Sequence, residues 1–235
     1  NLHLMMISFY RPTAKRYKIL IESDAFPSDS YAVKSQIKEK GYDPDEALIL
    51  WKPRTEEHLC RFEDLEAIME EHGNEIALVM IGNSNYYTGQ KYPIKAITEL
   101  GHKYGCKVGF DLAHGVGNID ADLHENGPDF AVWCTYKYLN SGPGAIGGCF
   151  VHERHANDKD IPRLTGWWGH KMDSRFNMRV DFDPIEGAEG WQLSNPPILS
   201  MAPIRASLEL FAEAGFENIR AKSRKITGYL EFLIQ

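Results

Sequence analysis

"PIKAITELGHKYGCKVGFDLAHG" (residues 93–115) decides the fold class, because it places a helix directly before a short apolar strand. A helix is predicted over 93–104, and Gly105 is a typical helix stop. The apolar run that follows predicts a strand over 107–111, with Asp111 as its last residue. This stretch is therefore one helix–strand unit of an α/β protein.

The same order of elements occurs elsewhere in the chain. "RFEDLEAIMEEHGNEIALVMIG" (61–82) predicts a helix that ends at Gly73 and a strand over 76–81. Helices that alternate with short apolar strands indicate an α/β fold with a mainly parallel sheet and helices on both faces. Further strands are predicted in "NLHLMMISFY" (1–10), "KRYKILIES" (15–23), "PDFAVWCTYKY" (128–138) and "GAIGGCFVHE" (144–153).

The two ends of the chain have the pattern of a domain interior. The first ten residues look like a strand, and the last segment, 202–234, is predicted to be helical apart from a break near Gly215. Natural domains usually end in surface segments. We therefore expect this chain to be an internal piece of a longer polypeptide.

The composition is that of an ordinary globular protein, with 43% hydrophobic and 25% charged residues among 235. The formal net charge of −7 argues against nucleic acid as a partner. No apolar run approaches the roughly 20 residues that span a bilayer, and no signal peptide opens the chain. The cysteines lack CxxC spacing and indicate reduced thiols in a cytosolic protein; they are Cys60, Cys106, Cys134 and Cys149.

Polar stretches follow three of the predicted strands, at the end of an open α/β sheet where ligands bind. They are "NSNYYTGQ" (83–90), "DLAHGVGN" (111–118) and "TYKYLNSGPG" (135–144), the last following a strand predicted over 129–135. One rim of the sheet would then carry a carboxylate, an imidazole, a phenol and an amine. These side chains belong to Asp111, His114, Tyr136 and Lys137.

A lysine at a strand end beside an aspartate can form a Schiff base with pyridoxal phosphate, if burial makes its neutral amine accessible. The aspartate would keep the pyridine nitrogen protonated, so that the ring can accept electrons. The small residues of 141–148 would leave Lys137 room to move. On residue types alone an alternative stays open, in which Lys137 is a solvated charge and Asp111 caps a turn.

A metal site is the other chemistry that these residue types suggest. His102, Cys106, Asp111 and His114 are possible zinc ligands, and "HERH" (152–155) sets two histidines three positions apart. However, His102 and Cys106 belong to the predicted helix, whereas Asp111 and His114 follow the next strand. No CxxC or HExxH motif anchors the set, so no metal site is predicted.

Six short stretches occur in an order and at spacings typical of one enzyme family. They are "FPSD" (26–29), "YYTGQ" (86–90), "FDLAH" (110–114), "YKYLN" (136–140), "GWWGH" (166–170) and "SNPPI" (194–198). Together they resemble the kynureninase family, fold-type I pyridoxal-phosphate enzymes of the aminotransferase class V group. The similarity runs through essentially the whole chain, and the last three stretches are its most specific part.

The resemblance implies a role for each matching residue. Lys137 would hold pyridoxal 5'-phosphate covalently and later move protons, with Tyr136 as a second candidate for proton transfer. Asp111 would pair with the ring nitrogen, and His114 would lie close to the ring. Phe26 would stack on the ring face, which is suited to an aromatic side chain. The other implied cofactor-binding residues are Pro27, Ser28 and Asp29 beside Phe26, Tyr136 and Trp167 at the phosphate, and Asn195 across a dimer interface.

The reaction implied by the resemblance is the hydrolysis of a carbon–carbon bond. L-Kynurenine or 3-hydroxykynurenine would give anthranilate or 3-hydroxyanthranilate plus L-alanine, in the kynurenine pathway of tryptophan catabolism towards NAD biosynthesis. "SNPPI" resembles the eukaryotic type, whose asparagine favours a 3-hydroxylated ring. One departure is Gly82-Asn83, which stands where some relatives place a hydroxyl near the cofactor.

The resemblance further implies a cytoplasmic homodimer that binds an amino-acid substrate and neither nucleic acid nor membrane. Residues 1–200 would form the pyridoxal-phosphate-binding large domain, incomplete at its N-terminus. Residues 201–235 would lead toward a small domain beyond the chain. Two alternatives are another class V enzyme, such as a cysteine desulfurase or lyase, and a catalytically silent scaffold fragment. A desulfurase needs a catalytic cysteine on a mobile loop, and no cysteine here lies in an obvious loop of that kind.

Overall fold

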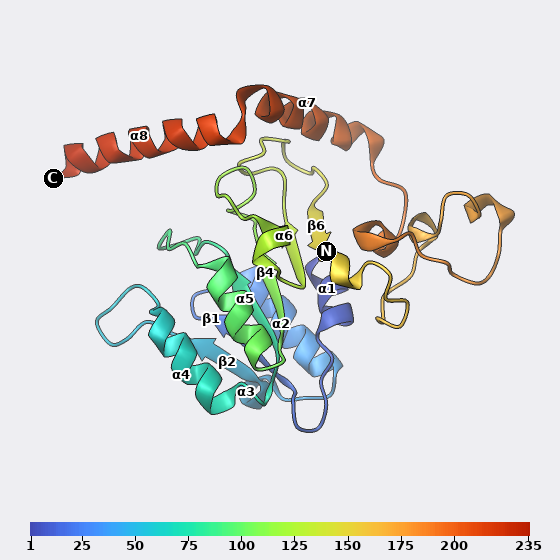
Figure 1. The fold of residues 1–235 in the computed structure, drawn as a ribbon, viewed down its shortest axis with the longest axis horizontal. Coiled ribbons are helices and arrows are strands. Elements are labelled where there is room, and N and C mark those ends of the chain that lie inside the picture. The colour runs from blue at the N-terminus through green and yellow to red at the C-terminus, as the bar shows by residue number, and fades with distance from the viewer.

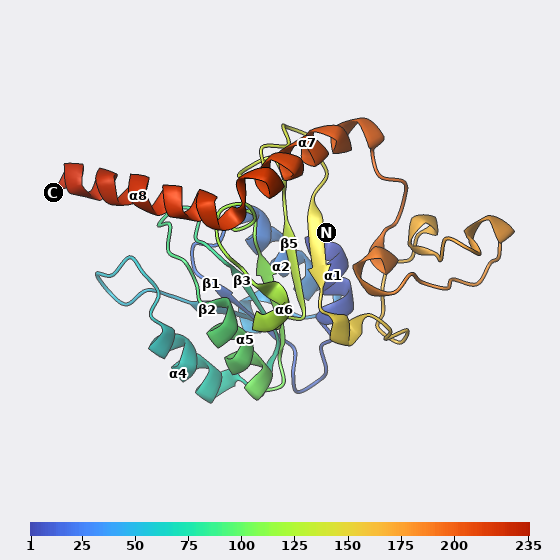
Figure 2. The ribbon, with the colours of Figure 1, turned by 45° about the horizontal axis from the view of Figure 1, so that its top comes forward.

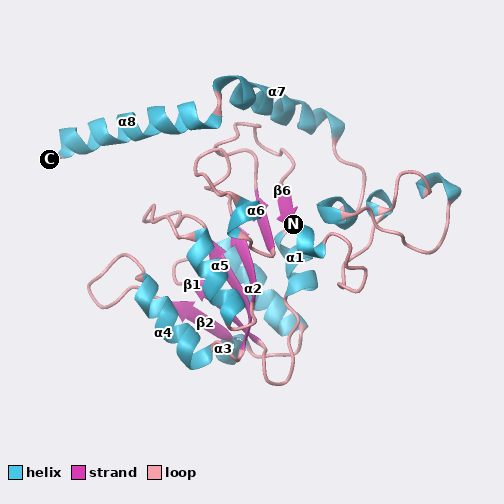
Figure 3. Ribbon diagram, in the orientation of Figure 1, coloured by secondary structure: helices cyan, strands magenta, loops and turns pink.

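One six-stranded sheet runs through the computed structural model, which describes all 235 residues. Its strands are β1 (Lys18–Glu22), β2 (Leu48–Trp51), β3 (Ile76–Gly82), β4 (Lys107–Asp111), β5 (Phe130–Trp133) and β6 (Gly148–Val151). Their spatial order is β2-β1-β3-β4-β5-β6, and only the edge strand β6 is antiparallel to its neighbour. The mainly parallel sheet expected from the sequence is confirmed (Figure 3).

The helices fall into three groups along the chain. Those of the sheet region are α1 (Leu2–Phe9), α2 (Pro27–Glu39), α3 (Pro44–Ala47), α4 (Phe62–His72), α5 (Ile94–Lys103) and α6 (Leu123–Asn126). Short 3₁₀ helices follow the last strand: η1 (Glu153–His155), η2 (Trp167–Gly169), η3 (Arg175–Asn177) and η4 (Gly187–Trp191). Two long helices end the chain, α7 (Ile198–Ala214) and α8 (Phe216–Ile234).

Helices cover both faces of the sheet, as expected (Figures 1 and 2). On one face, α1 and α2 share a buried cluster with Leu78 and Met80 of β3. On the other face, α4 and α5 share a second cluster with Val79 and Ile81. Successive residues of β3 thus face opposite clusters, which explains why the strand is apolar throughout rather than alternating.

The opening segment is a helix, so the strand predicted for residues 1–10 is wrong. Leu2, Met5, Met6 and Phe9 recur at helical spacing, and the last three are buried in the same cluster as α2. The strand interpretation depended on the continuous apolar run alone. The three-and-four-residue period within that run is the stronger signal, because it places one apolar stripe against the core.

Two further differences concern strand boundaries. β2, a short edge strand, was not predicted, since its four residues give no recognisable period. The strand predicted over 129–135 ends at Trp133, because Thr135 leaves the ladder. The Thr135 hydroxyl donates to the carbonyl of Ile146 at 2.6 Å, and the Ser141 hydroxyl donates to the Thr135 hydroxyl at 2.7 Å. These bonds fix the turn that carries Lys137.

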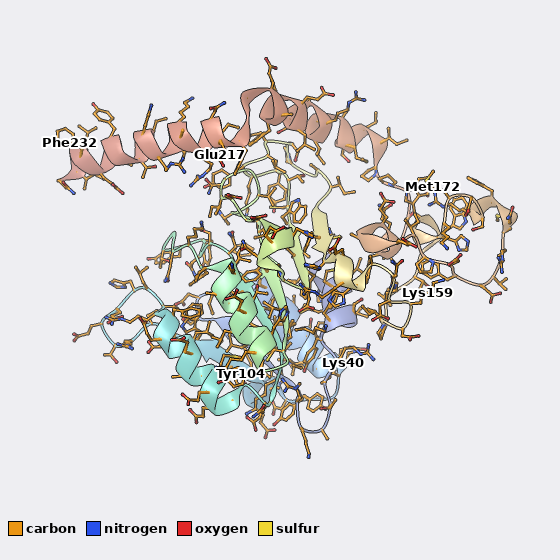
Figure 4. All side chains as sticks on the ribbon, in the orientation of Figure 1. Lys40, Tyr104, Lys159, Met172, Glu217 and Phe232 are labelled. Atoms are coloured by element: carbon orange, nitrogen blue, oxygen red, sulfur yellow. The ribbon has the colours of Figure 1, made fainter.

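Residues 156–192 form an irregular arm beside the sheet (Figure 1). The buried guanidinium of Arg175 holds part of this arm together, since it donates to the carbonyls of Trp168 and His170 and lies 4.3 Å from the Trp168 ring. The polar partners are backbone atoms, so the arm keeps its shape without regular secondary structure. Met172, labelled in Figure 4, is an exposed side chain of the arm.

The two C-terminal helices meet at Gly215, whose φ of +75° confirms the predicted break. Figure 1 shows α8 extending away from the sheet. Its apolar residues are largely exposed, and Phe232 (Figure 4) is 72% exposed. Despite this apolar surface, none of the helices has the combination of length and apolar composition that crossing a membrane requires.

Asp129 connects several elements at the amino ends of the strands. Its buried carboxylate accepts from the backbone N–H of Val108 at 2.8 Å and lies 2.9 Å from His102 and 2.7 Å from His155. Lys107 lies 3.2 Å away. Burial alone would raise the pKa of Asp129, but the histidine hydrogen bonds and the lysine charge outweigh it and hold this pKa below its usual value.

We expect Asp129→Asn to destabilise the fold by about 3 kcal/mol at neutral pH, because removal of one partner leaves buried donors uncompensated. Because the folded pKa of Asp129 is depressed, its stabilisation is present above the unfolded value and is lost as pH falls through the folded value. The difference in the free energy of unfolding between wild type and Asp129→Asn, measured by urea unfolding, should therefore become smaller at acidic pH. Asp64→Asn is the control, since the exposed Asp64–Arg54 pair is screened by solvent. Equal losses of unfolding free energy in Asp129→Asn and Asp64→Asn would contradict a stabilising role for Asp129.

Candidate active site

The polar segments that follow the strands meet at the carboxyl end of the sheet, as predicted. Gly82 ends β3 and is paired in register with Asp111, the last residue of β4. These strand ends and the loops beyond them enclose a small cavity of about 30 Å³. Its lining includes Glu22, Phe26, Asp29, Asp111, His114 and Lys137.

Lys137 lies in the turn after β5 and is directed toward His114. Its Nζ is 3.0 Å from Nε2 of His114 and 5.6 Å from the centre of the Phe26 ring. Burial and the nearby lysine charge lower the pKa of His114. The imidazole is therefore neutral near pH 7 and can accept a hydrogen bond from the amine.

Two aspartates lie opposite this amine and interact with each other. Asp29 comes from the first turn of α2, and burial together with the negative charges of Asp111 and Glu22 raises its pKa to about 8. Burial also raises the pKa of Asp111, although the N–H of Ala113, Lys137 and a hydrogen bond from Asp29 oppose this. Asp29 thus keeps its proton near neutral pH and donates it to Asp111.

Phe26 and the start of α2 form one wall of the cavity. Phe26 is 49% exposed, and its ring makes an edge contact with Tyr86 at 5.4 Å. Pro27 is the first residue of the helix, a position at which proline needs no partner for a backbone N–H. Ser28 and Asp29 line cavity space, whereas Pro27 does not. The helix therefore starts one residue after Phe26 and leaves that ring beside Lys137.

A larger cavity of about 910 Å³ adjoins the small one. The two share Phe26, Asp29, Asp111, Ala113 and Lys137. Tyr136, Asn195 and Ser28 line this larger space, so the structure brings them to the same region as Lys137. Tyr136 forms a hydrogen bond with Cys134, which raises the pKa of the phenol.

Trp167 is, with Pro27, a predicted site residue that does not line these cavities. Its indole N–H donates to the carbonyl of Arg175 at 3.4 Å, and the neighbouring Trp168 lines the larger cavity instead. A contact of Trp167 with a cofactor phosphate stays a prediction. The family resemblance assigned Trp167, whereas Trp168 is the tryptophan of this pair that lines the larger cavity.

The possible zinc ligands do not come together. His102 contacts Asp129 at the amino end of the strands, and the Cys106 thiol donates to the carbonyl of Gly73 at 3.6 Å. Asp111 and His114 lie at the carboxyl end. The structure therefore separates the four residues into two places at opposite ends of β4.

Glu22 is a site residue that sequence reasoning missed. It ends β1, is 3% exposed and lines the small cavity. The available signal was a carboxylate at the end of an apolar strand, the same signal that identified Asp111. Asn85 and Tyr86 from the loop after β3 also line the cavity, in a stretch that was quoted without assigned roles.

The acidic side chains of the small cavity determine the charge of the ligand that it can bind. Three carboxyl groups, of Glu22, Asp29 and Asp111, face the single amine of Lys137. Buried carboxyl groups that lack enough positive partners keep protons, as the raised pKa values show. A flat cationic ring between Phe26 and Asp111 would supply the missing charge and an apolar face. These residues thus fit a protonated pyridine ring.

Comparison with known proteins adds three findings. The sequence model of the family Aminotransferase class-V matches residues 4–235. A curated kynureninase from Myxococcus xanthus is 61% identical over 234 residues, which cover all of this chain and 55% of the relative. The chain thus spans about half the length of the curated relatives it matches.

Solved structures show the same fold at low sequence identity. The cysteine desulfurase CsdA from Escherichia coli has a TM-score of 0.76 at 16% identity, with 99% of this chain and 55% of that chain covered. A C-DES mutant with glycine covalently linked to its PLP cofactor has a TM-score of 0.73 at 16% identity, with 94% and 55% covered. At this identity the likeness shows the fold alone.

We expect Asp29→Asn to stabilise the cofactor-free protein at alkaline pH. The folded pKa of Asp29 is raised to about 8, so its favourable contribution is present at low pH and is lost as pH rises through about 8. The asparagine amide can still donate a hydrogen bond to Asp111 and does not ionise. The free energy of unfolding of the variant should therefore exceed that of the wild type by about 1 kcal/mol or more above pH 8. Thermal unfolding of both proteins across pH tests this, with exposed Asp173→Asn as the control. A variant that is less stable than wild type at every pH would contradict it.

Proposed function

Because this chain belongs to the aminotransferase class-V family, we propose that its cavity binds pyridoxal 5'-phosphate and that the complete protein is a kynureninase. The complete protein hydrolyses L-kynurenine or 3-hydroxykynurenine to anthranilate or 3-hydroxyanthranilate plus L-alanine. The observation that carries this is the Lys137 amine, which lies against His114 and Phe26 and opposite Asp29 and Asp111. The 61% identity to a kynureninase supports the choice of reaction over that of other family members.

The residues of the cavity would each hold one part of the cofactor. The Lys137 amine would hold the aldehyde carbon of the cofactor, and Asp111 would pair with the ring nitrogen. Phe26 covers one face of the ring, as its half-exposed ring beside Lys137 allows. Tyr136 and Trp167 are assigned to the phosphate, the first from its place in the larger cavity and the second from the family resemblance alone. Asn195, also in the larger cavity, is assigned to the substrate.

When bound, the cofactor supplies an electron sink for the bond changes at the substrate's α-carbon. Lys137 removes and returns protons at that carbon, because its amine is the base within reach. Asp111 holds a positive charge at the ring nitrogen, and its hydrogen bond from Asp29 orients the carboxylate. Tyr136 keeps its phenolic proton, since its pKa is raised. It could donate that proton to the β-carbon when water adds at the γ-carbonyl and the bond between these two carbons breaks.

The wider setting belongs to the same proposal. The protein acts in the kynurenine pathway of tryptophan catabolism, in the cytoplasm, as a homodimer with an amino-acid substrate. Exposed apolar side chains on α7 and α8, such as Leu199 and Phe232, support an assembly that covers them. Residues 1–200 form the cofactor-binding large domain and 201–235 lead out of it.

The test is hydrolysis of kynurenine and 3-hydroxykynurenine by the full-length protein that contains this chain. We expect the fluorescent anthranilate product and L-alanine in equal amounts, and no turnover by Lys137→Arg, which keeps the charge but cannot attach the aldehyde. Release of sulfide from L-cysteine, without cleavage of either kynurenine, would favour the desulfurase alternative. Lack of any reaction by a folded, cofactor-loaded protein would favour the silent scaffold.

We expect Asn195→Ala to reduce kcat/KM for 3-hydroxykynurenine far more than for kynurenine. A lost hydrogen bond to the ring hydroxyl is worth roughly 1–3 kcal/mol, and kynurenine lacks that hydroxyl. Steady-state kinetics of both substrates measure the difference. Ser194→Ala is the matched control, since it lines the same cavity beside Asn195. Equal losses on the two substrates would contradict the assignment of Asn195.

A further inference from the structure

The carboxyl group of Glu22 is buried at the carboxyl end of β1, where burial of a charge is costly. Both of its oxygens accept from the backbone N–H of Gly82, at 3.1 and 3.2 Å. It has no basic side chain as a hydrogen-bond partner, unlike Asp129 at the other end of the strands. A buried carboxyl group whose hydrogen-bond donors are backbone N–H groups alone calls for an explanation.

Hydrogen bonds and strand pairing at the end of β3 link Glu22 to Asp111. Gly82 is paired with Asp111 in the sheet, and the next N–H, of Asn83, donates to the carbonyl of Asp111 at 2.8 Å. A Cβ added at Gly82 would lie only 2.8 Å from Oε1 of Glu22. The glycine therefore makes room for the carboxyl group, and the carboxyl group in turn holds the strand end beside Asp111.

More acidic than basic side chains lie around Glu22. Burial raises its pKa to about 7, with a smaller contribution from Asp111 and an opposing one from the N–H of Gly82. At neutral pH it is therefore partly ionised, and a nearby positive charge would promote its ionisation. The titratable groups that face it are Asp29 from α2, Asp111 from β4, His114 and Lys137 across the cavity, and Cys60 and Tyr92 from the loops before α4 and α5.

We propose that Glu22 is a positioning residue of this site, whose carboxyl group holds the end of β3 beside Asp111 and adds negative charge that favours a cationic cofactor ring. The inference rests on the proposed function, because it takes the ring to be that of pyridoxal phosphate. Glu22 acts through Gly82 and Asp111. Binding of the ring then releases a proton from the cavity, so that affinity rises with pH.

The experiment compares wild type with Glu22→Gln, whose amide oxygen can still accept from Gly82. The probe is 4'-deoxypyridoxine 5'-phosphate, which keeps the pyridine ring and lacks the aldehyde, so that the lysine reaction does not contribute. Dissociation constants are measured by fluorescence between about pH 5.5 and about pH 8.5. The ratio of the wild-type dissociation constant to that of Glu22→Gln should change by about tenfold between these pH values. A change of this size follows if binding of the probe lowers the pKa of the Glu22 carboxyl group by about one unit. Glu75→Gln is the control, with the same charge change at the opposite end of β3.

The thermal stability of the cofactor-free proteins gives a second readout. Wild type should lose stability as pH rises through about 7, and Glu22→Gln should lose less, because the raised pKa of Glu22 makes its ionisation unfavourable in the folded state. A ratio of dissociation constants that does not change with pH would overturn the inference, as would parallel stability curves. Failure of the wild type to bind the probe at any pH would instead count against the proposed function.

Discussion

The concentration of three carboxyl groups around one amine, one of them buried and two half-buried, is the constraint on which the site depends. Parallel strands point their carboxyl ends to one edge, so acidic residues at the ends of β1 and β4 must meet there. The start of α2 adds a third carboxyl group, Asp29. The cavity holds more acidic groups than Lys137 alone can balance, so some of them keep protons, and a cationic ligand would favour their ionisation.

The other end of the same strands shows how a buried carboxylate behaves when its partners are complete. Asp129 contacts two histidines, a lysine and a backbone N–H, and its pKa is lowered. Glu22 is buried and Asp111 half-buried, but both have few positive partners, and their pKa values are raised. Carboxyl groups without enough positive partners are expected where a ligand supplies the missing charge. The raised and lowered pKa values thus distinguish the functional carboxyl groups of Glu22 and Asp111 from the structural carboxylate of Asp129.

The sequence predicted the sheet class, most of its strands and the convergence of Asp111, His114 and Lys137, because apolar runs and the polar residues that follow them are local signals. The opening helix was missed because a continuous apolar run concealed its period. β2 was missed because four residues show no period at all. Glu22 was missed although it ends an apolar strand as Asp111 does, because its burial beside Gly82 depends on the pairing of β1 with β3. The resemblance named Trp167 alone, and the place of Trp168 at the larger cavity was not foreseen, because an irregular segment does not reveal side-chain direction.

The central claim is that the Lys137 amine holds pyridoxal phosphate in this cavity. Its most direct test is to mix the protein with pyridoxal phosphate, reduce it with borohydride and map the modified peptide by mass spectrometry. A single pyridoxyl group on Lys137, accompanied by a visible absorption band that disappears on reduction, is the predicted result. Label spread over surface lysines, or no label on a folded protein, would contradict the claim.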